Sequence, residues 1–250
     1  MGDNKKIVIK EKRHIPFIST YGGIISVILL MMIFTTIFKP SFIKPSNLLQ
    51  LLVNNNSVLL AGLGMTFVIL GGGIDLSQGA LAAFSTMIVA LFLDFDMPVI
   101  IAICFTVIIG AVIGIINGAI VSIGKVHAFV VTLGMTTILR GFAVAVYGGY
   151  PIPIDMNSPI IAFGNKNTFG IPNVLWVCAA AFLVSITILK KTNIGRDVYA
   201  VGGNQEAARF SGISIVKTTI FAFAMSGALT ALAGVILASR MFSGLPSASE

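Results

Sequence analysis

The sequence predicts an all-α membrane protein, a polytopic bundle of about seven transmembrane helices with its N-terminus in the cytoplasm. Of its 250 residues, 56% are hydrophobic and only 10% are charged, and the mean hydropathy is +1.00. A soluble domain carries about 25% charged residues. So few charges cannot cover a surface that faces water, and lipid must therefore face much of this chain.

Seven apolar runs are long enough to form spans, since a helix needs about 20 residues to cross a bilayer. The first two runs are free of charged residues, and the third follows a single acid, Asp75. The fourth is also charge-free and is long enough to tilt or to include a turn. His127 and Arg140 interrupt the fifth, and the last two carry no charge. In order, the runs are 15–38, 45–74, 76–93, 97–124, 126–147, 171–189 and 218–239.

Two basic blocks predict which loops lie in the cytoplasm. Residues 1–14 and 190–217 each carry five basic and two acidic residues, so each block has a net charge of +3. Basic loops beside apolar spans are typical of the cytoplasmic side, whereas a nucleic-acid-binding protein presents its basic residues on a soluble face. We therefore expect residues 1–14 to form a cytoplasmic segment and residues 15–250 one transmembrane domain, with 190–217 as its main cytoplasmic loop.

The other loops follow by alternation from this start. The acidic turn at 94–96 falls outside, Lys125 falls inside, and residues 155–170 fall outside. The predicted sides and the charges of the loops agree, except that Lys39 and Lys44 fall outside, against the positive-inside bias.

Small residues at helical spacing predict close packing between spans. Gly110, Gly114 and Gly118 repeat every fourth residue in the fourth span. Such faces let helix backbones approach closely in lipid, where no hydrophobic force drives association. The seventh span carries a similar stripe, formed by Ser226, Thr230, Gly234 and Ala238.

The segment 71–79, Gly-Gly-Gly-Ile-Asp-Leu-Ser-Gln-Gly, separates the second and third spans. Its four glycines weaken helix formation, and Asp75 or Ser77 can cap a new helix. At membrane depth such broken backbone must line a cavity or the protein interior, which makes Gly72, Gly73, Asp75 and Ser77 candidates for a translocation pathway. The alternative is a plain cytoplasmic turn with Asp75 in water, and the spacing leaves both open.

Arg140 is a further candidate for the pathway. An Arg within a span costs about 2.5–3.5 kcal/mol on insertion scales, so it faces the bundle or reaches towards the interface. It either makes a polar contact near the pathway or binds a carboxylate or a helix end as a structural group.

The basic block 190–217 contains the pattern of a short capped helix. Asn204 is a capping residue, Glu206 falls in the first turn, Arg209 in the last turn, and Gly212 just past the end. The alternative is an ordinary solvated loop, but capping of so short an element, with glycines on both sides, favours a docking element for a cytoplasmic partner. The candidate docking residues are Gly202, Gly203, Asn204, Glu206, Ala207, Arg209, Ser211 and Gly212.

Enzymatic interpretations find little support. A nucleotide-binding P-loop needs a Gly ahead of Gly-Lys and a Ser or Thr after it, but Gly124-Lys125 has Ala119 and Val126 at those places. The sequence contains two histidines and no cluster of His, Cys and Glu that would bind a metal ion. We therefore expect no enzyme activity and no cofactor or metal of its own.

Three segments together resemble the permease subunits of the ribose/galactose/xylose class of ABC importers. The resemblance runs from about Pro40 to the end of the chain, and the order and spacing of the segments agree with that family. The most similar segment, Val198-Tyr-Ala-Val-Gly-Gly-Asn-Gln-Glu-Ala-Ala-Arg-Phe-Ser-Gly-Ile213, matches its cytoplasmic loop nearly residue by residue. The other two segments are 64–79 and 128–135 with Arg140-Gly141.

The resemblance implies a complete assembly in the bacterial cytoplasmic membrane. Two permease copies, identical or related, would form the pathway for a sugar such as ribose. Two ATPase subunits would bind ATP and magnesium and dock on residues 204–212, and an extracytoplasmic binding protein would deliver the sugar. Family members continue with further membrane helices beyond the position of Glu250, so the resemblance also implies that these helices are missing here.

A transporter of another class stays open as an alternative. A secondary transporter or channel for a small polar solute also uses broken apolar spans. It would work without ATP, and it leaves the capped cytoplasmic helix unexplained.

Overall fold

The computed structural model describes residues 17–248, with side chains from Gly22 onward. The predicted basic segment 1–14 lies outside these residues. Contacts divide the chain into two compact units, the first ending at Leu51 and the second beginning at Leu52. The first unit contains α1 (Phe17–Phe38), the 3₁₀ helix η1 (Pro40–Ile43) and most of α2 (Pro45–Asn54).

The second unit is a bundle of helices. The predicted all-α membrane fold is confirmed, and each of the seven apolar runs appears as a helix, the second as the pair α2 and α3. The helices of the second unit are, in chain order, α3 (Asn56–Leu70), α4 (Gln78–Asp94), α5 (Val99–Ser122), α6 (Ala128–Ala145), α7 (Pro159–Asn165), α8 (Asn173–Lys191), α9 (Asn193–Gly203), α10 (Gln205–Phe210) and α11 (Ile215–Met241).

Within residues 17–248, four helices are long and apolar enough to cross a membrane, namely α5, α6, α8 and α11. A fifth is added if the bent pair of α2 and α3 counts as one span, and α4 and the described part of α1 are shorter apolar helices. The shortness of α4 has a local cause, because the third span begins only at Gln78 after a stretch without helix.

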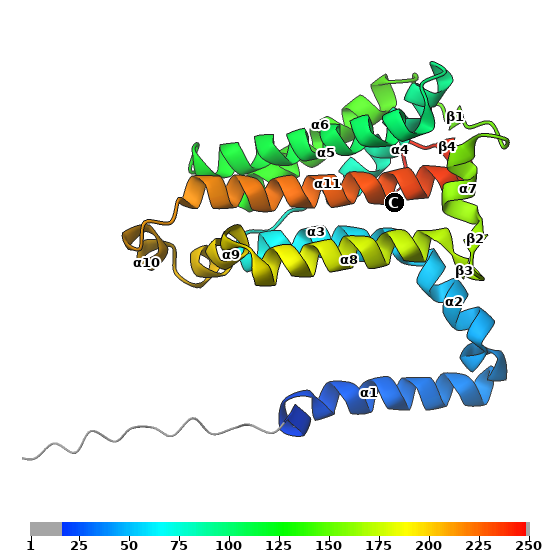
Figure 1. Ribbon diagram of the computed structural model, residues 1–250, viewed down its shortest axis with the longest axis horizontal. Coiled ribbons are helices and arrows are strands. Elements are labelled where there is room, and N and C mark those ends of the chain that lie inside the picture. Colours follow the sequence, from blue (N-terminus) through cyan, green and yellow to red (C-terminus); the bar gives the residue numbers. More distant parts are fainter. Residues whose placement is uncertain (1–16, 249–250) are drawn as a thin grey trace, which may run out of the picture. The chain divides into compact units, whose positions relative to one another are not determined.

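Helix α11 lies at the centre of the second unit. Its small residues let neighbouring helices approach on several sides: Gly227 lies against α5, and Gly234 lies against α4. It is mostly buried, and it packs against α3, α4, α5 and α7. Figure 1 shows α11 between α5 and α3 along most of its length.

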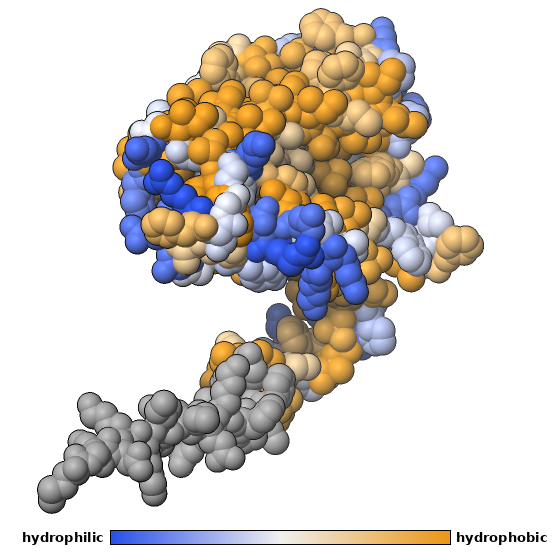
Figure 2. Space-filling view, turned by 60° about the vertical axis from the view of Figure 1, so that its left-hand side comes forward, coloured by the Kyte–Doolittle hydropathy of each residue, from blue (hydrophilic) through white to orange (hydrophobic). Residues whose placement is uncertain are grey.

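The outer helices leave most of their surface exposed, and that surface is apolar. On α5, for example, Ile100 and Ile108 are 76% and 55% exposed. Apolar surface of this extent is unfavourable in water and suits the hydrocarbon of a bilayer. Figure 2 shows the apolar surface over the helices and the hydrophilic residues gathered at the end that α9 and α10 form.

The two ends of the second unit collect different loops. The end with α9 and α10 also holds residues 71–74 and the connection between α5 and α6. At the opposite end (Figure 1), β1 (Ile152–Pro153) pairs with β4 (Ser243–Gly244), and β2 (Asn167–Thr168) pairs with β3 (Ile171–Pro172). The prediction that successive loops alternate between the two sides of the membrane requires this grouping, with the connections near 75 and 125 on the side of 190–217 and residues 155–170 on the other.

Candidate functional site

The connection from α3 to α4 runs back into the bundle. Helix α3 ends at Leu70, yet the side-chain amide of Gln78 donates to the carbonyl oxygen of Ala61 at 3.0 Å. At 1.5 Å per residue, Ala61 lies about 13 Å before the end of α3. The residues between the two helices therefore climb alongside α3 before α4 begins. Asp75 and Ser77 on this segment are 2% and 0% exposed, which rules out the alternative with Asp75 in water.

A buried polar network fixes the end of this segment that leads into α4. One carboxylate oxygen of Asp75 accepts from the backbone N–H and the hydroxyl of Ser77, at 3.0 and 2.6 Å. The other accepts from the hydroxyl of Ser226 on α11 at 2.8 Å. Ser226 in turn accepts from Gln78 at 2.8 Å, and Ser77 accepts from the amide of Asn117 on α5 at 3.2 Å. Neutral donors from the segment itself and from α11 thus hold the carboxylate, and side chains of α4 and α5 donate in turn to those two hydroxyls.

The network also contains an unmet hydrogen-bonding group. The side-chain oxygen of Asn117 is buried and has no hydrogen-bond partner among the described residues. A buried polar atom normally has a partner, so this oxygen is free to accept from a hydroxyl or a water that enters the site.

Glycines set the helix spacing that makes the network possible. A Cβ atom at Gly110, Gly114 or Gly118 would lie 2.4, 2.1 or 2.7 Å from the nearest atom of α11. On α3, a Cβ atom at Gly64 would lie 2.9 Å from the Cα atom of Ser226. These close approaches bring Asn117 and Ser226 within reach of the segment that carries Asp75.

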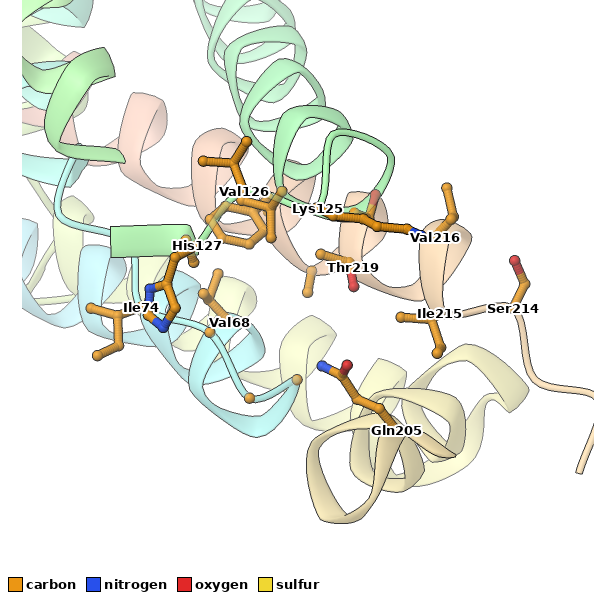
Figure 3. A pocket seen from close by; sticks show the side chains of 18 of the residues that line it. Val68, Ile74, Lys125, Val126, His127, Gln205, Ser214, Ile215, Val216 and Thr219 are labelled. Carbon is orange, nitrogen blue, oxygen red and sulfur yellow. The ribbon is translucent and has the colours of Figure 1, made fainter. Parts of the chain in front are cut away.

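A cavity of about 1040 Å³ opens at the end of the bundle that α9 and α10 form. Gly72, Gly73 and Ile74 line it on one side, and the end of α5 and the start of α6 line it with Lys125 and His127. Figure 3 shows Gln205 of α10 facing this opening, with Ile215 at the start of α11 beside it. The cavity therefore joins the broken segment to the predicted docking helix.

Helix α10 has the capping pattern that the sequence predicts. The side-chain oxygen of Asn204 accepts from the backbone N–H of Ala207 at 3.0 Å, with Glu206 in the first turn and Arg209 in the last. At the other end, Gly212 has φ +81°, and the N–H of Ile213 donates to the carbonyl of Ala208 at 3.0 Å. This is the Schellman motif that ends a helix at a left-handed glycine.

The sequence pattern predicts one helix in the basic block 190–217, and the structure has two. Gly202 and Gly203 were expected to flank the docking helix in a loop, but they are the last residues of α9. Thr192 caps α9 by accepting from the N–H of Gly195 at 3.2 Å. Val198 and Val201 then bury one face of α9, which overcomes the weak helix propensity of the glycines.

The candidate docking residues share one exposed surface. Gly202, Gly203, Asn204, Glu206, Ala207, Arg209, Ser211 and Gly212 are all exposed. Phe210, which is not among the predicted docking residues, is 91% exposed at the end of α10. A large aromatic side chain at a capped helix end, outside the apolar spans, is typical of an interface anchor.

One predicted site residue lies away from the cavity, and three residues of the polar network were not predicted to belong to a site. Arg140 is exposed on α6 and is not among the residues that line the cavity. Gln78 and Asn117 were not predicted, although each is a polar residue within or beside an apolar run. Ser226 was noted only as a small packing residue.

Taken together, the apolar bundle, the broken helix at its interior and the polar end with its cavity define a multi-pass membrane protein. A family model described as the permease component of branched-chain amino acid transport systems matches residues 47–249. The chain belongs to this family of permease components. Its place is therefore in the bacterial cytoplasmic membrane, as a multi-pass protein.

Individual relatives are similar over most of the chain. It is 39% identical over 235 residues to the ribose import permease protein RbsC of Haemophilus influenzae, covering 93% of this chain and 72% of that protein. It is 40% identical to RbsC of Bacillus subtilis, covering 88% and 69%. It is 33% identical to the L-arabinose transport system permease protein AraH of Escherichia coli, covering 91% and 69%. No solved structure matches the chain.

Proposed function

We propose that this chain is the membrane-spanning permease subunit of an ATP-driven importer for a monosaccharide, ribose or a related sugar such as arabinose. The observation that carries the proposal is the cavity that joins an exposed, capped helix to a buried break in a span. The names of the relatives support the substrate class, since ribose and arabinose permeases match along nearly the whole chain.

The broken segment supplies the pathway in this proposal. Gly72 and Gly73 line the cavity. Asp75 and Ser77 follow directly in the chain and belong to the buried network. A sugar presents hydroxyl groups that both donate and accept, and the unpartnered oxygen of Asn117 is an acceptor for such a group. Arg140 has a weaker case, because it is exposed on α6 and does not line the cavity.

The surface of α9 and α10 supplies the docking site for ATPase subunits. These subunits bind ATP and magnesium, so the permease needs no cofactor and is not itself an enzyme. A second permease copy, identical or related, completes the pathway, and an extracytoplasmic binding protein brings the sugar to the opposite end of the bundle. The capped helix with its exposed Phe210 favours this reading over a secondary transporter, which has no use for such a projection.

The docking site is tested by Phe210→Ala in a complex with the importer's ATPase subunit. We expect the substitution to weaken co-purification of the ATPase by about 2 kcal/mol or more, the loss typical of a buried interface anchor, and to abolish sugar uptake. Phe169→Ala is the matched control, because Phe169 is 93% exposed and lies between β2 and β3, at the other end of the bundle. Equal ATPase binding by both variants would contradict the assignment of α10.

A further inference from the structure

The docking helices and the buried segment meet at one close backbone contact. Gly202 of α9 packs against the end of α3, where a Cβ atom would lie 1.8 Å from the carbonyl oxygen of Leu70 and 3.2 Å from the backbone nitrogen of Gly72. Any side chain at this position would push α9 and the end of α3 apart. At Gly203, by contrast, a Cβ atom would meet nothing within 4 Å.

Both sides of this contact are firmly held. On α9, Val198 is fully buried, and it belongs to the same hydrophobic core as Phe67 of α3. On the other side, the N–H groups of Gly72 and Gly73 donate to the carbonyls of Ile69 and Val68, each at 2.9 Å. These bonds close the end of α3 into a tight turn, with φ +83° at Gly72. A displacement of α9 should therefore move the turn at the end of α3, because neither side of the contact can deform easily.

The contact is continuous with α10 on one side and with the polar network on the other. Asn204 ends α9 and also caps α10, so the two helices share a residue and move together. Beyond Gly72, the chain reaches Asp75, whose carboxylate is tied to Ser226 of α11 at 2.8 Å. The turn at the end of α3 thus lies between the docking surface and the buried carboxylate.

We propose that Gly202 transmits the movement of a docked α10 to the segment that carries Asp75. It acts as a positioning residue, touching neither ATP nor the transported solute. This inference rests on the proposed function, because it assumes that an ATPase docks on α10. A push on α10 moves α9, the Gly202 contact moves the turn at Leu70 to Gly72, and residues 73–77 then shift against α11.

The test follows the movement at Ile74, which is 49% exposed and lines the cavity. Ile74→Cys is introduced after Cys104 and Cys178 are replaced by Ala, and its rate of thiol labelling is measured in the ATPase complex with and without ATP and magnesium. With Gly202 in place, we expect nucleotide to change the rate. In Gly202→Ala, the nucleotide-dependent change, measured on complexes that contain the ATPase, should shrink about tenfold, as for an ordinary coupling free energy.

Gly62→Ala is the matched control. It makes the same substitution on α3, where a Cβ atom meets nothing within 4 Å, and it should keep the full nucleotide response. An unchanged response in Gly202→Ala would overturn the transmission proposal while leaving ATP-driven transport intact. A native complex that shows neither nucleotide response nor ATP-dependent uptake would instead overturn the proposed function, and this inference with it.

If Gly202→Ala does not assemble, the native chain answers the same question. Asp75 and Ser77 are buried and out of a docked partner's reach. Hydrogen exchange at their amides should nevertheless change when the ATPase subunit binds to the reconstituted permease. Unchanged exchange at these two amides, with altered exchange in α10, would overturn the proposal.

Discussion

At the scale of single residues, the protein depends on positions where no side chain fits. Gly114 is the tightest of the three glycines of α5, because its missing Cβ would lie 2.1 Å from the carbonyl oxygen of Phe223. The obstacle is backbone, which cannot rotate away as a side chain can. The spacing between α5 and α11 is therefore set at this position, and the hydrogen bond from Asn117 to Ser77 depends on that spacing.

We expect Gly114→Ala to destabilise the protein by about 2 kcal/mol, the usual cost of forcing extra atoms into a packed interior. The measurement is the midpoint of thermal unfolding in detergent. Gly134→Ala is the control, since Gly134 lies in α6 and a Cβ atom there meets nothing within 4 Å. Both substitutions replace Gly by Ala within a helix, so both gain the same helix propensity. Equal unfolding midpoints for Gly114→Ala and the control would therefore refute the packing argument.

At the scale of elements, short helices at the polar end are stabilised by their caps. Helix α10 has only six residues, and isolated helices of that length are not stable in water. The hydrogen bond from Ala207 to Asn204 and the turn at Gly212 replace much of what a longer helix gains from its own bonds. Loss of either cap should therefore loosen α10 without disturbing the spans.

Asn204→Ala removes the cap and should weaken α10 by about 1 kcal/mol. Hydrogen exchange at the amides of Ala207 to Phe210 should become faster, while exchange in α11 stays the same. Asn204→Asp keeps an oxygen that accepts from the N–H of Ala207, and it should retain the native protection. Native exchange rates in the Ala variant would show that the cap contributes nothing to α10.

The elements differ in how far a single sequence predicts them. The seven apolar runs and the caps of α10 are local patterns, and they are found as predicted. Helix α9 was missed, because it is stabilised by burial of Val198 and Val201 against distant parts of the chain, while Gly202 and Gly203 argue against a helix. The network around Asp75 was equally out of reach, since it depends on the register between α4, α5 and α11, which no short segment encodes.

At the scale of the whole molecule, the loops sort into two ends with different character. One end gathers α9, α10 and the cavity lined by Lys125 and Arg209. The other gathers the short strands, α7 and the turn after α4. The positive-inside bias predicts that the first end faces the cytoplasm, the compartment in which ATP is available.

This orientation is tested with single cysteines at the two exposed aromatic positions, after Cys104 and Cys178 are replaced by Ala. Phe210→Cys should react with a membrane-impermeant maleimide only after the cells are permeabilised. Phe169→Cys should react with the same reagent when it reaches the outer face of an intact cytoplasmic membrane. Labelling of Phe210→Cys from outside would reverse the topology and remove α10 from contact with any ATPase.

The late start of α4 at Gln78 has a consequence for how this end of the bundle can open. Where a complete helix would form a stiff wall, the chain instead has a short non-helical strap, held by the carboxylate of Asp75 at one end and by the turn at Gly72 at the other. Moving a strap breaks a few hydrogen bonds, whereas moving a rod requires the repacking of a whole helical face. This end of the bundle can thus open locally, with the remaining helices left in place.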